Sequence, residues 1–140
     1  MDRQEFLKTC GMACLASIGV ASLLQSCASS QYFAKSEVEG EYLKVLLTEF
    51  SAERKYVLIR SERLNFPIYL YQVNTSEYSA VWMECTHQGA ELSAHGELLT
   101  CPAHGSEFDK LGQVMQGPAQ SNLRKFKTKT ENQHVLIHLY

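Results

Sequence analysis

Two short stretches of this chain decide its fold and its chemistry. Residues 85–90 read Cys-Thr-His-Gln-Gly-Ala, and residues 101–109 read Cys-Pro-Ala-His-Gly-Ser-Glu-Phe-Asp. Each stretch places one thiol and one imidazole a few residues apart, with a glycine close behind the histidine, and thirteen residues separate His87 from Cys101. Sulfur and nitrogen donors brought together on two short loops indicate a metal centre.

The candidate ligands are Cys85, His87, Cys101 and His104. Two thiolates can bind one iron of a [2Fe–2S] cluster while two imidazoles bind the other iron, and this is the ligand set of a Rieske centre. The same four donors also satisfy a tetrahedral zinc ion. Zinc fingers usually pair Cys with Cys and His with His along the sequence, whereas each stretch here mixes the two residue types.

The two stretches closely resemble the signatures of the Rieske family, which run Cys-Thr-His-x-Gly and Cys-Pro-x-His-Gly-Ser. The segment Gly117-Pro118-Ala119 also resembles the loop with which that family covers its cluster. The resemblance spans roughly residues 42–140 and implies one Rieske-type [2Fe–2S] cluster per chain. It further implies that the residues around the ligands approach or hydrogen-bond the cluster; these are Gly89, Gly105, Ser106 and Pro118.

The chain departs from the family pattern at several positions. In the quinol-oxidising branch each loop carries one more cysteine and the two form a disulfide, but the matching positions here are Ala90 and Ala103. Ser106 matches a serine that donates a hydrogen bond to the cluster, whereas Phe108 stands where high-potential members have a tyrosine. One donor kept and one lost predict an intermediate reduction potential, inside the span of about −150 to +300 mV for Rieske centres.

The rest of the chain reads as an all-β domain. Runs rich in β-branched and aromatic residues, separated by polar turn-like stretches, lie at residues 42–47, 55–60, 66–73, 78–83, 97–100, 123–128 and 134–139. Runs of this length and spacing predict an antiparallel sandwich or barrel. With the resemblance, the expected fold is a Rieske-like antiparallel β sandwich or barrel, in which two hairpin loops form a cluster-binding subdomain. The expected domain covers residues 42–140.

The N-terminus is typical of an export signal. A polar start containing Arg3 and Lys8 precedes a short apolar run, which ends in Leu24-Gln25-Ser26-Cys27. Residues 1–26 are therefore predicted to be a signal peptide. The ending resembles the lipobox of bacterial lipoproteins, which implies that Cys27 is the lipid anchor and that residues 27–41 form a tether. An uncleaved transmembrane anchor is the alternative interpretation.

These features predict a one-electron carrier without a catalytic site of its own, lipid-anchored on the periplasmic or outer side of a bacterial membrane. Its expected partner is a c-type cytochrome, a quinol-oxidising complex or a larger oxidoreductase subunit. Alternatives are the small Rieske subunit of a periplasmic oxidoreductase or of a quinol–cytochrome c reductase and, in another class, a zinc-stabilised surface lipoprotein. A net charge of −2 gives no basic excess for binding a nucleic acid.

Overall fold

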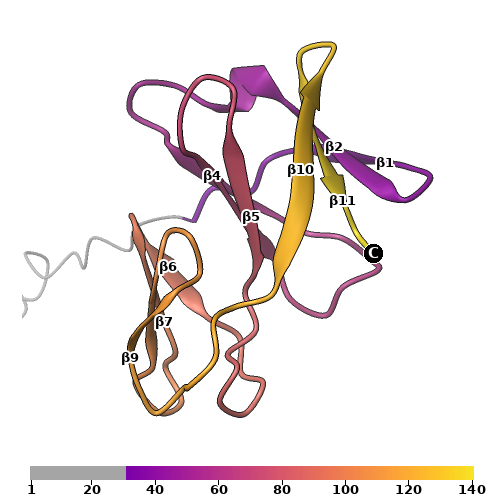
Figure 1. Cartoon of the computed structure of the whole chain (residues 1–140). Coiled ribbons are helices and arrows are strands. Elements are labelled where there is room, and N and C mark those ends of the chain that lie inside the picture. Colours follow the sequence, from indigo (N-terminus) through magenta and orange to yellow (C-terminus); the bar gives the residue numbers. More distant parts are fainter. Residues whose placement is uncertain (1–30) are drawn as a thin grey trace, which may run out of the picture. The chain divides into compact units, whose positions relative to one another are not determined.

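The computed structural model describes residues 31–140, so that the predicted signal peptide and Cys27 lie outside the described residues. Seven strands form the larger sheet, here called the base sheet: β1 (Ser36–Glu39), β2 (Tyr42–Leu46), β3 (Tyr56–Ile59), β4 (Ile68–Gln72), β5 (Tyr78–Trp82), β10 (Lys125–Glu131) and β11 (His134–His138). Their order across the sheet is β1-β2-β11-β10-β5-β4-β3, and all neighbours are antiparallel (Figure 1). A short 3-10 helix, η2 (Leu47–Glu49), follows β2. Within residues 31–140 no helix has the length and apolar character needed to cross a bilayer.

One hydrophobic cluster fills the inner side of the base sheet. It includes Leu43 and Val45 from β2, Ile137 from β11, and Val57 and Ile59 from β3. Because β2 and β3 lie towards opposite ends of the strand order, residues from both can meet only if the sheet curves around its core. In Figure 1, β1, β2 and β11 lie beside and partly behind β10 and run obliquely to β4, β5 and β10.

Strands β3, β4 and β5 are buried on both faces. In β4, Leu70 points into the first hydrophobic cluster, whereas Tyr69 and Tyr71 point into a second one. In β5, Ala80 and Val81 divide in the same way. Burial on two faces explains why these strands are apolar almost without interruption and show no alternation of polar and apolar residues.

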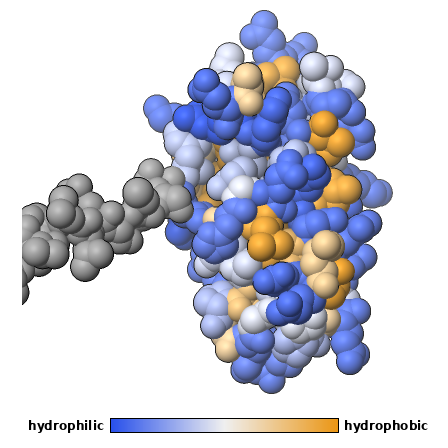
Figure 2. Space-filling view, turned by 90° about the vertical axis from the view of Figure 1, so that its left-hand side faces the viewer, coloured by the Kyte–Doolittle hydropathy of each residue, from blue (hydrophilic) through white to orange (hydrophobic). Residues whose placement is uncertain are grey.

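A second, four-stranded sheet, here called the small sheet, covers the outer face of β3–β5. Its strands, in the order β6-β7-β8-β9, are β6 (Ser93–His95), β7 (Leu98–Thr100), β8 (Glu107–Asp109) and β9 (Val114–Gln116). In sequence it is an insertion between β5 and β10, two strands that pair directly in the base sheet through Val81 and Lys125. On the side shown in Figure 2, apolar residues reach the surface in small patches among polar ones.

Two tyrosines of β4 hold the small sheet against the base sheet. The Tyr69 hydroxyl donates a hydrogen bond to the Gly96 carbonyl at 2.8 Å, in the turn between β6 and β7. The Tyr71 hydroxyl donates to Glu97, and the Lys110 ammonium lies 2.9 Å from the same carboxylate. Hydrogen bonds from Tyr71 and Lys110 hold the pKa of Glu97 below its usual range, and burial raises the pKa of Tyr69.

The predicted boundary of the tether is wrong at its C-terminal end. Strand β1 lies within residues 27–41, and Ala34, just before it, is buried in the first cluster. The prediction missed these residues because β1 is four residues long, carries two glutamates and is an edge strand, so its sequence looks like a polar linker. The folded domain therefore includes the chain from residue 31 onwards.

Candidate metal centre

The two motif-bearing loops have the same pattern of backbone hydrogen bonds. In the first loop, residues 85–90, the Cys85 N–H donates to the Ala90 carbonyl and the Gly89 N–H donates to the Cys85 carbonyl, both at 2.8 Å. In the second loop, residues 101–106, Cys101, Gly105 and Ser106 make the same two bonds, at 2.8 and 3.0 Å.

The glycine in each loop has a positive φ, which is +77° for Gly89 and +81° for Gly105. This backbone conformation is costly for residues with a Cβ, and it explains why both motifs carry glycine here. The loops differ in one respect within the common hydrogen-bond pattern, because the histidine stands third in the first loop and fourth in the second.

Both cysteines are buried on the inner side of the loops. Cys85 and Cys101 are 2% exposed, are free thiols and belong to the second hydrophobic cluster. Cys85 continues the alternation of Val81 and Met83, so the direction of β5 aims its side chain into that cluster. The sulfurs are thus placed where water is excluded.

The two histidines lie side by side, nearer to solvent. The ring centroids of His87 and His104 are 4.9 Å apart and the rings are nearly perpendicular, at 87°. His104 is exposed and His87 is partly buried. The Nδ1 atom of His87 is buried and has no hydrogen-bond partner in the described part of the chain. A buried nitrogen without a partner costs free energy, whereas coordination to a metal would satisfy it.

A third segment, residues 117–123, ties both loops together and corresponds to the predicted proline loop. The Ala119 N–H donates to the Ser106 hydroxyl at 3.0 Å, and the Thr86 hydroxyl donates to the Ser121 carbonyl at 2.6 Å. Pro118 itself is exposed. Ser106 is fully buried, and its oxygen accepts the Ala119 bond, so its own proton is left to donate. The sequence singled out Ser106 and Pro118, but the bond from Thr86 depends on residues 35 positions apart and has no local signal.

The four donor side chains match a Rieske cluster in type and number. Among residues 31–140, no three His, Cys, Asp or Glu side chains converge closely enough to hold a single metal ion. A structural zinc needs four donors at about 2.0–2.3 Å from one centre, whereas a Rieske cluster needs only two protein donors on each iron. Two buried thiols and two neighbouring imidazoles therefore fit the two-iron cluster.

An open hollow of about 640 Å³ adjoins the first loop. Its lining includes Cys85, His87 and Gln88 of that loop, Trp82 of β5, and Arg124, which directly precedes β10. The Arg124 guanidinium is held in place by the Leu139 carbonyl at 3.2 Å and lies over the Trp82 ring. The hollow leaves the loop that carries His87 open to solvent.

Comparison with known sequences identifies the family. The sequence model of the Rieske [2Fe-2S] domain matches residues 35–127, about two thirds of the chain. The chain belongs to the Rieske [2Fe-2S] domain family. This confirms the family and the cofactor predicted from the two motifs, and the antiparallel β architecture confirms the predicted fold class.

Two relatives show which members this Rieske chain resembles. It is 38% identical over 55 residues to the cytochrome b6-f complex iron-sulfur subunit 1 of Nostoc sp., a match covering 38% of this chain and 31% of that protein. It is 41% identical over 51 residues to the ubiquinol-cytochrome c reductase iron-sulfur subunit of Blastochloris viridis, covering 34% of this chain and 28% of that protein. The matched segment thus spans about a third of the length of these relatives.

Among solved structures, the plasma membrane Rieske protein PetC3 of Synechocystis PCC 6803 superposes with a TM-score of 0.52 at 26% identity. The superposition covers 61% of this chain and 87% of that one.

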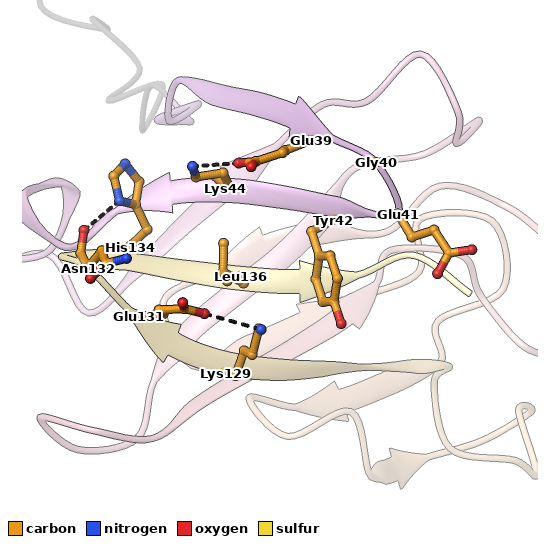
Figure 3. A pocket seen from close by; sticks show the side chains of 10 residues that line it. All are labelled: Glu39, Gly40, Glu41, Tyr42, Lys44, Lys129, Glu131, Asn132, His134 and Leu136. Atoms are coloured by element: carbon orange, nitrogen blue, oxygen red, sulfur yellow. Dashed lines mark hydrogen bonds and ion pairs between the residues drawn. The ribbon is translucent and has the colours of Figure 1, made fainter.

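A second hollow, of about 490 Å³, lies on the outer face of β1, β2, β11 and β10 (Figure 3). Two ion pairs lie among its charged side chains, Lys44 with Glu39 at 2.6 Å and Lys129 with Glu131 at 3.2 Å, and the Glu41 carboxylate pairs with His138 just outside it. The Lys44 ammonium accordingly lowers the pKa of Glu39, and Glu39 raises the pKa of Lys44. Since these charges satisfy each other, nothing in this hollow points to a ligand.

Proposed function

We propose that this Rieske protein is a membrane-anchored one-electron carrier, in which Cys85, His87, Cys101 and His104 hold a single [2Fe–2S] cluster. The observation that carries the ligand assignment is the buried Nδ1 of His87, which has no partner among the described residues and lies next to the His104 ring, together with the burial of the free thiols of Cys85 and Cys101. When bound, the cluster supplies a centre that takes up and releases one electron at a time.

The protein's own contribution is position, burial and hydrogen bonding. The hydrophobic cluster around Cys85 and Cys101 keeps water from the sulfur side of the site. The exposed ring of His104 lets a redox partner approach from the opposite side without rearrangement of the chain. The free proton of the buried Ser106 hydroxyl is a donor for cluster sulfur, and such bonds favour the reduced, more negative state.

The decisive experiment is an EPR spectrum of the dithionite-reduced full-length protein, with iron and zinc measured on the same sample. We expect a Rieske-type signal with two irons per chain. Replacing Cys85 by Ser should abolish the signal, whereas replacing His95, an exposed histidine of β6, by Ala should preserve it. Zinc without the signal, in protein made with ample iron, would refute the carrier and favour the zinc-stabilised surface lipoprotein.

The membrane anchor is the second part of the proposal. Export by the signal peptide and acylation of Cys27 would place the domain on the periplasmic or outer side of a bacterial membrane. Mass spectrometry of the membrane-extracted protein should find Cys27 as an acylated N-terminus. The Cys27→Ala variant should lose the modification and the Cys14→Ala variant should keep it. An intact, unmodified residue 1–30 segment would instead support the transmembrane anchor.

The partner is proposed from the relatives, which are iron-sulfur subunits of quinol-oxidising complexes. A donor of that kind, with a c-type cytochrome as acceptor, fits a carrier whose histidine-bearing loops are uncovered. The alternative is a small subunit of a larger periplasmic oxidoreductase. Rapid mixing of the reduced protein with an oxidised c-type cytochrome distinguishes the two, because only the free carrier should be oxidised without its parent enzyme.

A further inference from the structure

The described chain begins with a segment that is bound along the edge of the base sheet. The Leu58 N–H donates to the Tyr32 carbonyl at 3.0 Å, and the Ala34 N–H donates to the Leu58 carbonyl at 2.9 Å. Residues 31–34, here called the docked segment, thus lie parallel to β3 through the pairing of Phe33 with Leu58.

The docked segment is also fastened to the small sheet. The Gln31 side-chain amide donates to the Ala94 carbonyl of β6 at 2.8 Å. The chain is therefore held to both sheets from its first described residue. Any freedom that the tether gives the domain has to come from residues before Gln31.

Two exposed aromatic rings of the docked segment are each covered by an arginine. Tyr32 and Phe33 are 41% and 37% exposed. The Arg54 guanidinium lies 3.7 Å from the Tyr32 ring centroid, and the Arg60 guanidinium lies 4.5 Å from that of Phe33.

Phe33 is paired with Leu58 of the second cluster, whereas Tyr32 lies on the side of Ala34 of the first cluster, so the two ring–arginine pairs flank the sheet edge from opposite sides. We call the edge formed by these four side chains the aromatic–arginine face. Aromatic rings and snorkelling cations are the side chains that proteins place at the headgroup level of a bilayer.

The charge of this region has the sign that an anionic membrane surface attracts. Residues 31–35 and 53–60 contain four exposed cations and one exposed carboxylate; these are Lys35, Arg54, Lys55, Arg60 and Glu53. The Glu49 carboxylate adds a second negative charge, because it accepts a hydrogen bond from the Tyr32 hydroxyl at 2.6 Å. The local balance is thus 4 − 2 = +2, in a chain whose net charge is −2. Guanidinium groups bind phosphate oxygens through paired hydrogen bonds, so phospholipid headgroups match this face.

The length of the tether brings the same face to the membrane. Three residues separate Cys27 from Gln31. Four residue steps span at most about 14 Å, even in fully extended chain. A folded domain of 110 residues has a radius of gyration of about 13 Å and hence a diameter of more than twice that. With Cys27 at the headgroups, the far side of the domain cannot turn towards the bilayer.

We propose that the aromatic–arginine face rests on the phospholipid headgroups of the membrane that carries the Cys27 anchor, and that it holds the domain in one orientation. This inference rests on the membrane attachment in the proposed function. The four side chains of the face belong to neither histidine-bearing loop, residues 85–90 and 101–106, so both loops stay available to a redox partner.

The test is EPR spectroscopy of the reduced full-length lipoprotein in oriented multilayers of phosphatidylethanolamine and phosphatidylglycerol. The signal of a Rieske cluster is anisotropic, so a fixed domain gives line amplitudes that change as the multilayer is rotated in the field. We expect this angle dependence in the wild-type protein. It should be lost in the variant Tyr32→Ser/Phe33→Ser/Arg54→Gln/Arg60→Gln. The control variant Val73→Ser/Lys127→Gln, which also replaces an exposed apolar residue and a cation, should retain it.

A second variant tests whether the domain is oriented by the aromatic–arginine face or only by the short tether. Ten glycine and serine residues inserted between Ser30 and Gln31 should leave the angle dependence in place, because the face itself makes the contact. Loss of orientation in this variant, or orientation that survives in the quadruple variant, would overturn the inference. So would a normal Rieske signal without angle dependence in the wild-type protein. Absence of any Rieske signal would instead contradict the proposed function.

Discussion

Replacing Tyr69 by Phe removes one hydroxyl and keeps the ring. The ring is fully buried and stacks on Tyr56 and Tyr71 with centroids 4.9 and 6.3 Å away, so packing should be unchanged. The lost bond is the one from the Tyr69 hydroxyl to the Gly96 carbonyl, which joins β4 to the turn between β6 and β7. A neutral hydrogen bond contributes about 1 kcal/mol net, so Tyr69→Phe should lower the free energy of unfolding by about 1 kcal/mol near pH 8. In a domain of this size that is about 4 °C in Tm.

The same substitution should reverse its effect at alkaline pH. Burial raises the pKa of Tyr69 above its ordinary value of 10.0, so the folded state keeps the phenol proton where the unfolded chain has released it. The unfolded state then binds fewer protons, and stability falls above pH 10 by up to about 1.4 kcal/mol per pH unit. At pH 11 the loss is about 1.4 kcal/mol, which exceeds the contribution of the hydrogen bond. The Phe variant should therefore be the more stable protein above about pH 11.

Urea unfolding at several pH values, followed by the fluorescence of Trp82, the single tryptophan, measures both effects. Tyr140→Phe is the matched control, because Tyr140 is 72% exposed. Its replacement should change the free energy of unfolding only slightly, and by the same amount at every pH. A difference between wild type and Tyr69→Phe that stays constant from pH 8 to pH 11.5 would refute the reasoning, since the buried phenol would then not retain its proton.

Further predictions concern the loops. Ser106→Ala should lower the reduction potential by tens of millivolts and at most about 130 mV, because a hydrogen bond to a charged acceptor contributes about 1.5–3 kcal/mol and 59 mV corresponds to a tenfold change for one electron. Phe108→Tyr should raise the potential, since the buried ring stands where high-potential members carry a tyrosine hydroxyl. Redox titration of both variants measures the two shifts. Shifts of equal sign would contradict the roles given to Ser106 and to position 108. Gly105→Ala should cost about 1–2 kcal/mol from its positive φ alone. Gly89→Ala should cost more, because its Cβ would lie 3.2 Å from Glu84 Oε1, and equal unfolding free energies and iron retention in the two variants would argue against this difference.

Most strands of the base sheet could be predicted from the sequence because they are apolar and separated by polar turns. Residues 66–73 and 134–139 each contain a strand of the structure, whereas the run 123–128 covers only the first part of β10, which continues to Glu131. The strands that were missed are short: β6, β8 and β9 have three residues each, and β1 has four with two glutamates. Runs this short carry too little hydrophobic periodicity to distinguish a strand from a loop.

The candidate ligands could be found because the motifs are local, with all donors within two short stretches. What could not be found is how distant residues complete the site. Thr86 binds the Ser121 carbonyl across 35 positions, and Gln31 binds Ala94 across 63. Such contacts depend on the topology of the fold, and no spacing of residues in the sequence predicts them.

The small sheet is an insertion between β5 and β10, two strands that pair with each other in the base sheet. The inserted segment follows Trp82 and ends before Arg124. The Trp82 N–H donates a hydrogen bond to the Arg124 carbonyl at 2.9 Å, so the two ends of the insertion are in contact. The first hydrophobic cluster contains no residue between these two points. Residues 83–123 therefore form a cassette whose attachment points are no farther apart than neighbouring strands. Any antiparallel hairpin with a suitable covering face could receive it, and an electron carrier could in this way be grafted onto an unrelated β scaffold.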